Sequence, residues 1–123
     1  MQPSMEFLTA EESAQVDAAL LTSKDKFSTR LAIYSLRCLS QIAAETGLPP
    51  EKITPEQVNA WIEQDENIQQ HLDVDRNFQN FFTRLVMASL PHLKQVAQEF
   101  DLPVQDLTVK QVVQWFEKKG KIE

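Results

Sequence analysis

The chain is poor in the residues from which disulfides, metal sites and phosphate-binding loops are built. It contains one cysteine, Cys38, so it can form no internal disulfide and offers no cysteine pair for zinc. Its only histidines, His71 and His92, belong to no HxxxH or Glu-x-x-His pattern. Its two glycines, Gly47 and Gly120, leave no glycine-rich loop for a phosphate. We therefore expect no metal, no cofactor, no catalytic residue and no enzymatic activity.

Long apolar runs and positive charge are scarce as well. The longest apolar stretch, residues 85–88 continuing to Leu90, is far shorter than the about 20 residues that span a bilayer, so no membrane insertion is expected. Twelve Lys and Arg residues against 18 Asp and Glu residues give a formal net charge of -6, which opposes binding to nucleic acid. The first residues lack the basic start and apolar run of a signal peptide, so we expect a cytoplasmic location.

What the chain does have is an internal repeat. Residues 29–63 recur as residues 83–117, without a gap, and 16 of the 35 aligned positions are identical. Unrelated segments match at only about one position in fifteen, so the pattern predicts a duplication. The identical residues of the first copy are Thr29, Arg30, Leu31, Ser35, Leu36, Leu39, Gln41, Ala43, Glu45, Leu48, Pro49, Thr54, Gln57, Val58, Trp61 and Glu63.

Composition and periodicity predict an all-α fold. Leu, Ala, Gln, Glu and Lys are abundant, and runs of β-branched residues are few. We expect one domain over residues 1–123, with an N-terminal helix over 9–22, a first repeat over 24–65 and a second over 76–119.

Each repeat is expected to form a hairpin of one long and one shorter helix. The shorter helices start at Thr54 and Thr108, each followed three positions later by a glutamine that can complete a capping box. Two such hairpins can bury their apolar stripes only against each other or against another chain. The prediction is a four-helix core with an approximate twofold axis and an additional N-terminal helix, opened by the capping box of Thr9 and Glu12.

Several duplicated residues invite a functional reading beside a structural one. Trp61 and Trp115 could stack on a ligand, but their survival in both copies favours core packing. Arg30 and Arg84 open the long helices, and a pair of arginines near a twofold axis could hold a phosphate or carboxylate. They could equally form structural ion pairs with the duplicated glutamates.

The positions at which the copies differ are more informative about function, because the shared scaffold does not require one residue type there. Such pairs are Lys24 and Phe78, Ser28 and Phe82, Thr46 and Phe100, and Arg37 and Pro91. Phe78, Phe82 and Phe100 thus give the second copy an aromatic cluster. If exposed, it would suit a protein partner or self-association. The alternative is that the N-terminal helix covers Phe78 and Phe82.

One segment has a likeness to a DNA-binding helix. Residues 107–119 resemble the recognition helix of homeodomains, with Leu-Thr, then Gln-Val, then Trp-Phe and basic residues. Lys118 stands where that family has its base-reading asparagine. The first copy has Gln64, Asp65 and Glu66 where basic residues would face phosphate, and acidic groups there would repel DNA. The likeness is better explained by helix capping and core anchors.

A second resemblance covers most of the chain. Residues 5–13, MEFLTAEES, and residues 26–31, KFSTRL, are similar to those of small all-helical proteins from photosynthetic bacteria. The resemblance implies a cytoplasmic or thylakoid-facing accessory role and no particular activity. The leading hypothesis is a noncatalytic protein-interaction or assembly module. The alternatives are an anion or small-molecule carrier that uses Arg30 and Arg84, and a nucleic-acid-binding regulator.

Overall fold

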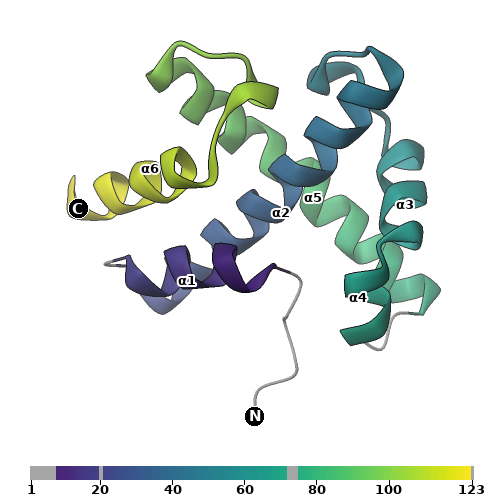
Figure 1. The fold of residues 1–123 in the computed structure, drawn as a ribbon, viewed down its shortest axis with the longest axis horizontal. Coiled ribbons are helices and arrows are strands. Elements are labelled where there is room, and N and C mark those ends of the chain that lie inside the picture. The colour runs from purple at the N-terminus through teal and green to yellow at the C-terminus, as the bar shows by residue number, and fades with distance from the viewer. Residues whose placement is uncertain (1–7, 20, 72–74, 123) are drawn as a thin grey trace.

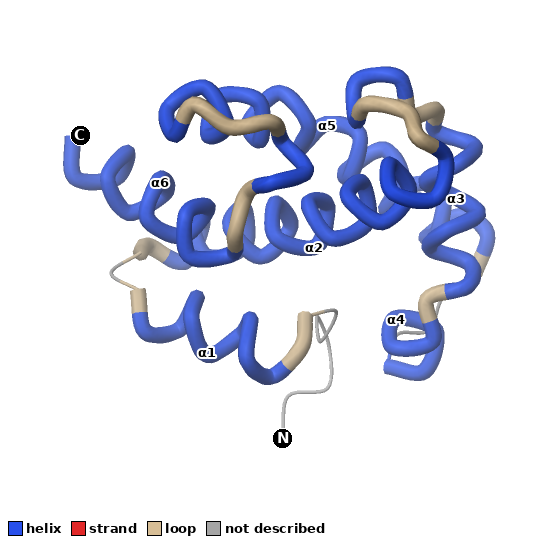
Figure 2. Tube along the Cα trace, turned by 45° about the horizontal axis from the view of Figure 1, so that its top comes forward, coloured by secondary structure: helices blue, strands red, loops and turns tan. Residues whose placement is uncertain are grey.

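A computed structural model describes residues 8–19, 21–71 and 75–122 of the chain (Figures 1 and 2). The described residues form helices and connecting loops, with no strand among them, so the all-α prediction is confirmed. The elements are α1 (Ala10–Ala18), α2 (Ser23–Thr46), η1 (Pro50–Lys52), α3 (Pro55–Gln64), α4 (Glu66–His71), α5 (Arg76–Phe100), η2 (Val104–Asp106) and α6 (Val109–Ile122).

The helix starts follow the capping signals of the sequence. The Thr9 hydroxyl accepts a bond from the Glu12 amide at 3.1 Å, and the Glu12 carboxylate accepts one from the Thr9 amide at 3.0 Å. A capping box formed by Thr54 opens α3 in the same way. These side chains satisfy amides that have no partner within the helix. At the other end of α2, Gly47 adopts the left-handed conformation, with φ of 78°, that a glycine accepts without strain.

The two long helices cross in the middle of the molecule, and the shorter helices lie on either side (Figure 1). Helix α3 packs on α5 and α2, whereas α6 packs on α2 and α5, so each short helix contacts the long helices of both halves. Helix α1 lies against α2 and α6. This arrangement is the predicted four-helix core with an additional N-terminal helix.

Both halves have the same order of elements: a long helix, a 3-10 turn and a shorter helix. The turns η1 and η2 and the starts of α3 and α6 are each separated by 54 residues, as are the matched residues of the repeat. A common origin of the two halves remains a prediction from the sequence.

The core is apolar except for four small hydroxyl residues at two matched pairs of positions. They are Thr29 and Thr83, and Ser35 and Ser89. The Ser35 hydroxyl donates to the carbonyl of Leu31 at 2.8 Å, and Ser89 makes the matching bond within α5 at 3.1 Å. Because each hydroxyl has a partner, burying it costs little. No helix in the described ranges is both long enough and apolar enough to cross a membrane.

Candidate functional site

The structure separates the three aromatic residues that the sequence singled out for partner binding. Phe82 is only 2% exposed, so the hypothesis that it offers a surface ring to a partner is wrong. Its ring lies 5.2 Å from that of Tyr34 on α2 and stacks 5.7 Å from that of Phe78. Tyr34 on α2 therefore holds Phe82 in the core, whereas the N-terminal helix α1 packs on α2 and α6. Phe78 and Phe100 are half-buried, and a contact between either and a partner remains a prediction.

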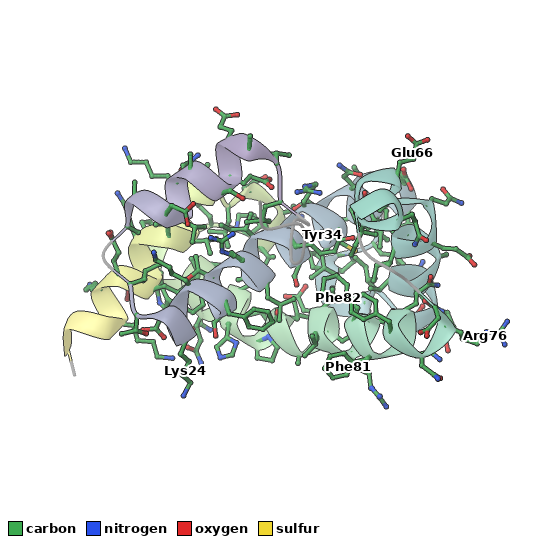
Figure 3. The ribbon with its side chains drawn as sticks, turned by 90° about the horizontal axis from the view of Figure 1, so that it is seen from below. Lys24, Tyr34, Glu66, Arg76, Phe81 and Phe82 are labelled. Atoms are coloured by element: carbon green, nitrogen blue, oxygen red, sulfur yellow. The ribbon has the colours of Figure 1, made fainter. Side chains whose placement is uncertain are left out.

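The exposed aromatic residue of α5 is Phe81, the neighbour of Phe82, which the sequence had singled out. Phe81 is 49% exposed and Phe27 is 40% exposed, and they are the two large apolar side chains exposed among the described residues. Figure 3 shows Phe81 on the outer side of α5, whereas Phe82 points toward Tyr34. Adjacent helix positions differ by about 100°, so one of two neighbouring phenylalanines faces out when the other faces in. The sequence pattern alone did not say which.

The two duplicated arginines have different surroundings. Arg30 forms an ion pair of 2.6 Å with Asp17 of α1. The alternative of a structural ion pair therefore applies to Arg30, although its partner is not one of the duplicated glutamates. Arg84 is exposed and lines a shallow groove between α3 and α5 with Pro55, Glu56 and Asn59, among others, but without Arg30. The structure gives no support to a joint anion site.

A buried polar and aromatic cluster, which the sequence did not reveal, surrounds Tyr34. The Tyr34 hydroxyl donates to the Asp65 carboxylate at 2.6 Å, and its ring meets the edge of Trp61 at 5.6 Å. The guanidinium of Arg37 lies 5.3 Å from the centre of the ring. Tyr34 is fully buried. Burial first, and then the hydrogen bond and the negative charge of Asp65, raise the pKa of Tyr34 far above its usual value.

This Tyr34 cluster also connects α1 to the core. Arg37 forms a 2.6 Å ion pair with Glu12, the same carboxylate that completes the capping box at the start of α1. One side chain therefore both starts the helix and fixes it to α2. Cys38 lies fully buried beside the cluster. Burial, followed by the negative charge of Asp65, raises the pKa of the Cys38 thiol to about 12, which makes it a poor nucleophile at neutral pH.

A cleft of about 520 Å³ opens next to the cluster, and we call it the Trp61 cleft. Its lining residues come from the second half of α2, from α3 and from the start of α4: Arg37, Gln41, Ile42, Glu45, Thr46, Gln57, Ala60, Trp61, Gln64, Asp65 and Glu66. The Trp61 indole donates to the Gln41 side chain at 3.1 Å, which fixes the ring at the wall of the cleft. Trp61 is half-buried, so the expectation that it belongs wholly to the core is only partly met.

In the matching region of the second half, two lysines of the chain lie near the tryptophan and the glutamate. The ammonium group of Lys119 lies 5.1 Å from the centre of the Trp115 ring, and Lys118 pairs with Glu99 at 3.8 Å. In the first half, Gln64 and Asp65 occupy the positions of these two lysines. Both tryptophans are half-buried, but a lysine of the chain lies over Trp115, whereas Trp61 lines a cleft.

A second distinctive surface is the outer face of α5, defined by Phe81, Arg84, Ala88 and Pro91. All four side chains are exposed. Of the matching positions of α2, Phe27 is exposed as well, but the other three are more covered: Tyr34 is fully buried, and α1 supplies carboxylates to the two arginines there, as described above. Helix α5 has three basic residues and one acidic residue, a net charge of +2 in a chain of net charge -6. The α5 outer face is therefore partly apolar and lies on a helix of net positive charge.

Nothing in the described part of the chain groups three or more His, Cys, Asp or Glu residues that could hold a metal ion. The fold and its surfaces therefore define a small all-helical protein whose distinctive features are a cleft and an uncovered helix face. The chain belongs to the family described as NDH complex assembly factor CRR9, whose family model matches residues 8–123. The match is consistent with the resemblance to small helical proteins of photosynthetic bacteria. No curated protein and no solved structure matches the chain.

Proposed function

We propose that this chain is a noncatalytic assembly factor for an NDH complex and that it acts by binding a protein component of that complex. The observation that carries the proposal is the match of the family model to residues 8–123, nearly the whole chain. A cytoplasmic location, expected from the sequence, is part of the same proposal and is tested by cell fractionation.

The outer face of α5 is the surface that best suits such a partner. Phe81 places an aromatic ring in solvent, and Arg84 stands one turn away on the same face. Aromatic residues and arginine are enriched at protein interfaces and often supply much of the binding energy. Phe78 and Phe100 lie on the same helix and, being half-buried, could contribute at its edges.

Deletion of the gene, followed by native electrophoresis of NDH complexes, tests the function. We expect less fully assembled complex in the deletion strain and recovery when the wild-type chain is returned. Phe81→Asp should fail to restore the complex although the variant protein accumulates, because a charge in the apolar contact opposes binding. Phe27→Asp is the matched control, because Phe27 holds the same position on α2 and is similarly exposed. A deletion strain with a normal amount of complex contradicts the proposal.

The two alternatives gain no support from the family match. A carrier that uses Arg30 and Arg84 would need both guanidinium groups at one ligand, yet Arg30 is paired with Asp17. Thermal melting with millimolar phosphate or citrate tests it, because a bound anion would raise the melting temperature. A nucleic-acid regulator would have to overcome a net charge of -6, and binding measurements at low salt test that idea.

A further inference from the structure

The two tryptophan regions provide an internal comparison that points to a ligand for the Trp61 cleft. Trp115 is covered by the ammonium group of Lys119, and Lys118 pairs with Glu99 nearby. In the second half, therefore, one lysine of the chain itself lies over the tryptophan ring and the preceding lysine pairs with the glutamate. In the first half the tryptophan and the glutamate are both retained, as Trp61 and Glu45.

The cations are what the first half lacks. Gln64 and Asp65 stand at the positions of Lys118 and Lys119, and Thr46 stands at the position of Phe100. Relative to the second half, the first two differences remove a positive charge from this region, and the third removes the volume of an aromatic ring. The outcome is a cleft of about 520 Å³, a size at which proteins commonly hold a small group or a side chain.

The lining of the cleft has the chemistry to attract a cation. Glu45, Asp65 and Glu66 contribute three carboxylates. The one basic residue of the lining, Arg37, is engaged by Glu12 at 2.6 Å and lies over the Tyr34 ring, so its charge is largely compensated. Asp65 is held in place by the bond from the Tyr34 hydroxyl at 2.6 Å. The Asp65 carboxylate, one helical turn after Trp61, is thus positioned before any ligand arrives.

We propose that the Trp61 cleft binds a lysine or arginine side chain of a protein partner. The cationic head group takes the place that Lys119 has in the second half, over the indole ring of Trp61, with Asp65 and Glu45 as its counter-charges. The Gln41 bond to the indole nitrogen and the Tyr34 contact hold the ring in position. The inference rests on the proposed function only in taking the source of the side chain to be a protein.

The test uses the purified protein alone, so its outcome is independent of the deletion experiment. N-acetyl-arginine amide and N-acetyl-lysine amide are titrated into the ¹⁵N-labelled protein, and the indole N–H signals of the tryptophans are followed by NMR. Trp115→Phe assigns the two signals. The neutral control is N-acetyl-citrulline amide, which keeps the shape of the arginine derivative without its charge. We expect both cationic derivatives, and not the citrulline derivative, to shift the Trp61 signal in a saturable way at millimolar concentration.

Two substitutions distinguish this cleft from general attraction to an acidic protein. Gln64→Lys places a lysine in the cleft at the position of Lys118, and because Gln64 is exposed the fold should be unaffected; the added positive charge should lower the apparent affinity at least fivefold. Glu45→Gln should also weaken binding, whereas Glu56→Gln, which removes the same charge from α3 outside the cleft, should not. Equal shifts with the citrulline derivative, equal shifts at Trp61 and Trp115, or an unchanged titration of Gln64→Lys would each overturn the proposal.

Discussion

The Trp61 and Trp115 regions have the same helical framework and differ in what surrounds each ring. Trp61 contacts a buried tyrosine and stands at an open cleft, whereas Trp115 is packed against Phe116 and covered by a lysine. The shared residues form the helix caps, whereas the residues around each ring differ between the halves. The comparison teaches that residues at matching positions of a repeat can have different neighbours.

The comparison is tested most strongly at Phe82, which completes the aromatic packing around Tyr34 and has Ser28 as its counterpart in α2. Phe82→Ala should lower the free energy of unfolding by about 3–5 kcal/mol, because it leaves a cavity in the core. Ser28→Ala should change it by less than about 0.5 kcal/mol. Urea unfolding of both variants measures the difference. A Phe82→Ala protein as stable as wild type would show that the ring is not part of the core.

Tyr34 provides the second test, because its counterpart in α5 is Ala88, whose side chain has no titratable group. Tyr34→Phe should lower the free energy of unfolding at pH 7 by about 1–2 kcal/mol, since the bond to Asp65 is lost. The effect on alkaline stability is more specific. In the native state the raised pKa keeps the phenol protonated above pH 10, whereas the unfolded chain releases that proton.

Stability should therefore be complete below about pH 9 and fall as the pH rises. Cys38 contributes to the loss from about pH 9 to about 12, and Tyr34 contributes above its usual pKa of 10.0. Removing the phenol should reduce the slope above pH 10 by up to about 1.4 kcal/mol per pH unit. Urea unfolding at pH 8, 9.5 and 11 measures it. A variant with the wild-type slope would contradict the assignment of alkaline sensitivity to Tyr34.

Glu12 tests how the first half holds α1. Glu12→Ala removes both the capping bond and the ion pair with Arg37, and it should cost about 1 kcal/mol. Glu12→Gln can still accept the capping bond but carries no charge, so it should recover part of that loss. Chemical unfolding in low and high salt separates the two terms. If the two variants were equally destabilised, the capping bond would contribute nothing.

Much of the fold could be predicted from the sequence because its signals are local. Capping boxes and the spacing of apolar residues give helix boundaries, and the start of α3 after Thr54 is an example. Helix α5 likewise begins at Arg76, the first residue of the expected second repeat. Helix α2 begins at Ser23, one residue before the expected first repeat, because Thr22 accepts a bond from the Asp25 amide.

The candidate site was less predictable because it depends on contacts between distant segments. Tyr34 and Asp65 are 31 residues apart, and the bond between them requires α2 and the end of α3 to meet. Thr46 and Phe100 were identified as a position at which the two copies differ, but the sequence could not show that Thr46 lines a cleft. The direction in which Phe81 and Phe82 point depends on how α5 is rotated against α2, which tertiary packing decides.

The smallest expected effect concerns the duplicated arginines. The Arg30 ion pair joins a side chain that is 21% exposed to Asp17, which is 58% exposed, so water screens it and Arg30→Ala should cost at most about 0.5 kcal/mol. Among the described residues Arg84 has no ion-pair partner, so Arg84→Ala should leave the free energy of unfolding unchanged. The same substitution at Arg84 should nevertheless weaken partner binding, because Arg84 lies on the α5 outer face. Unfolding of both variants, with co-purification of NDH components, distinguishes an arginine that holds α1 from one that is free for a partner. If Arg84→Ala lost stability and kept binding, the two arginines would have the same structural role, and the contrast between a covered α2 and an uncovered α5 would fail.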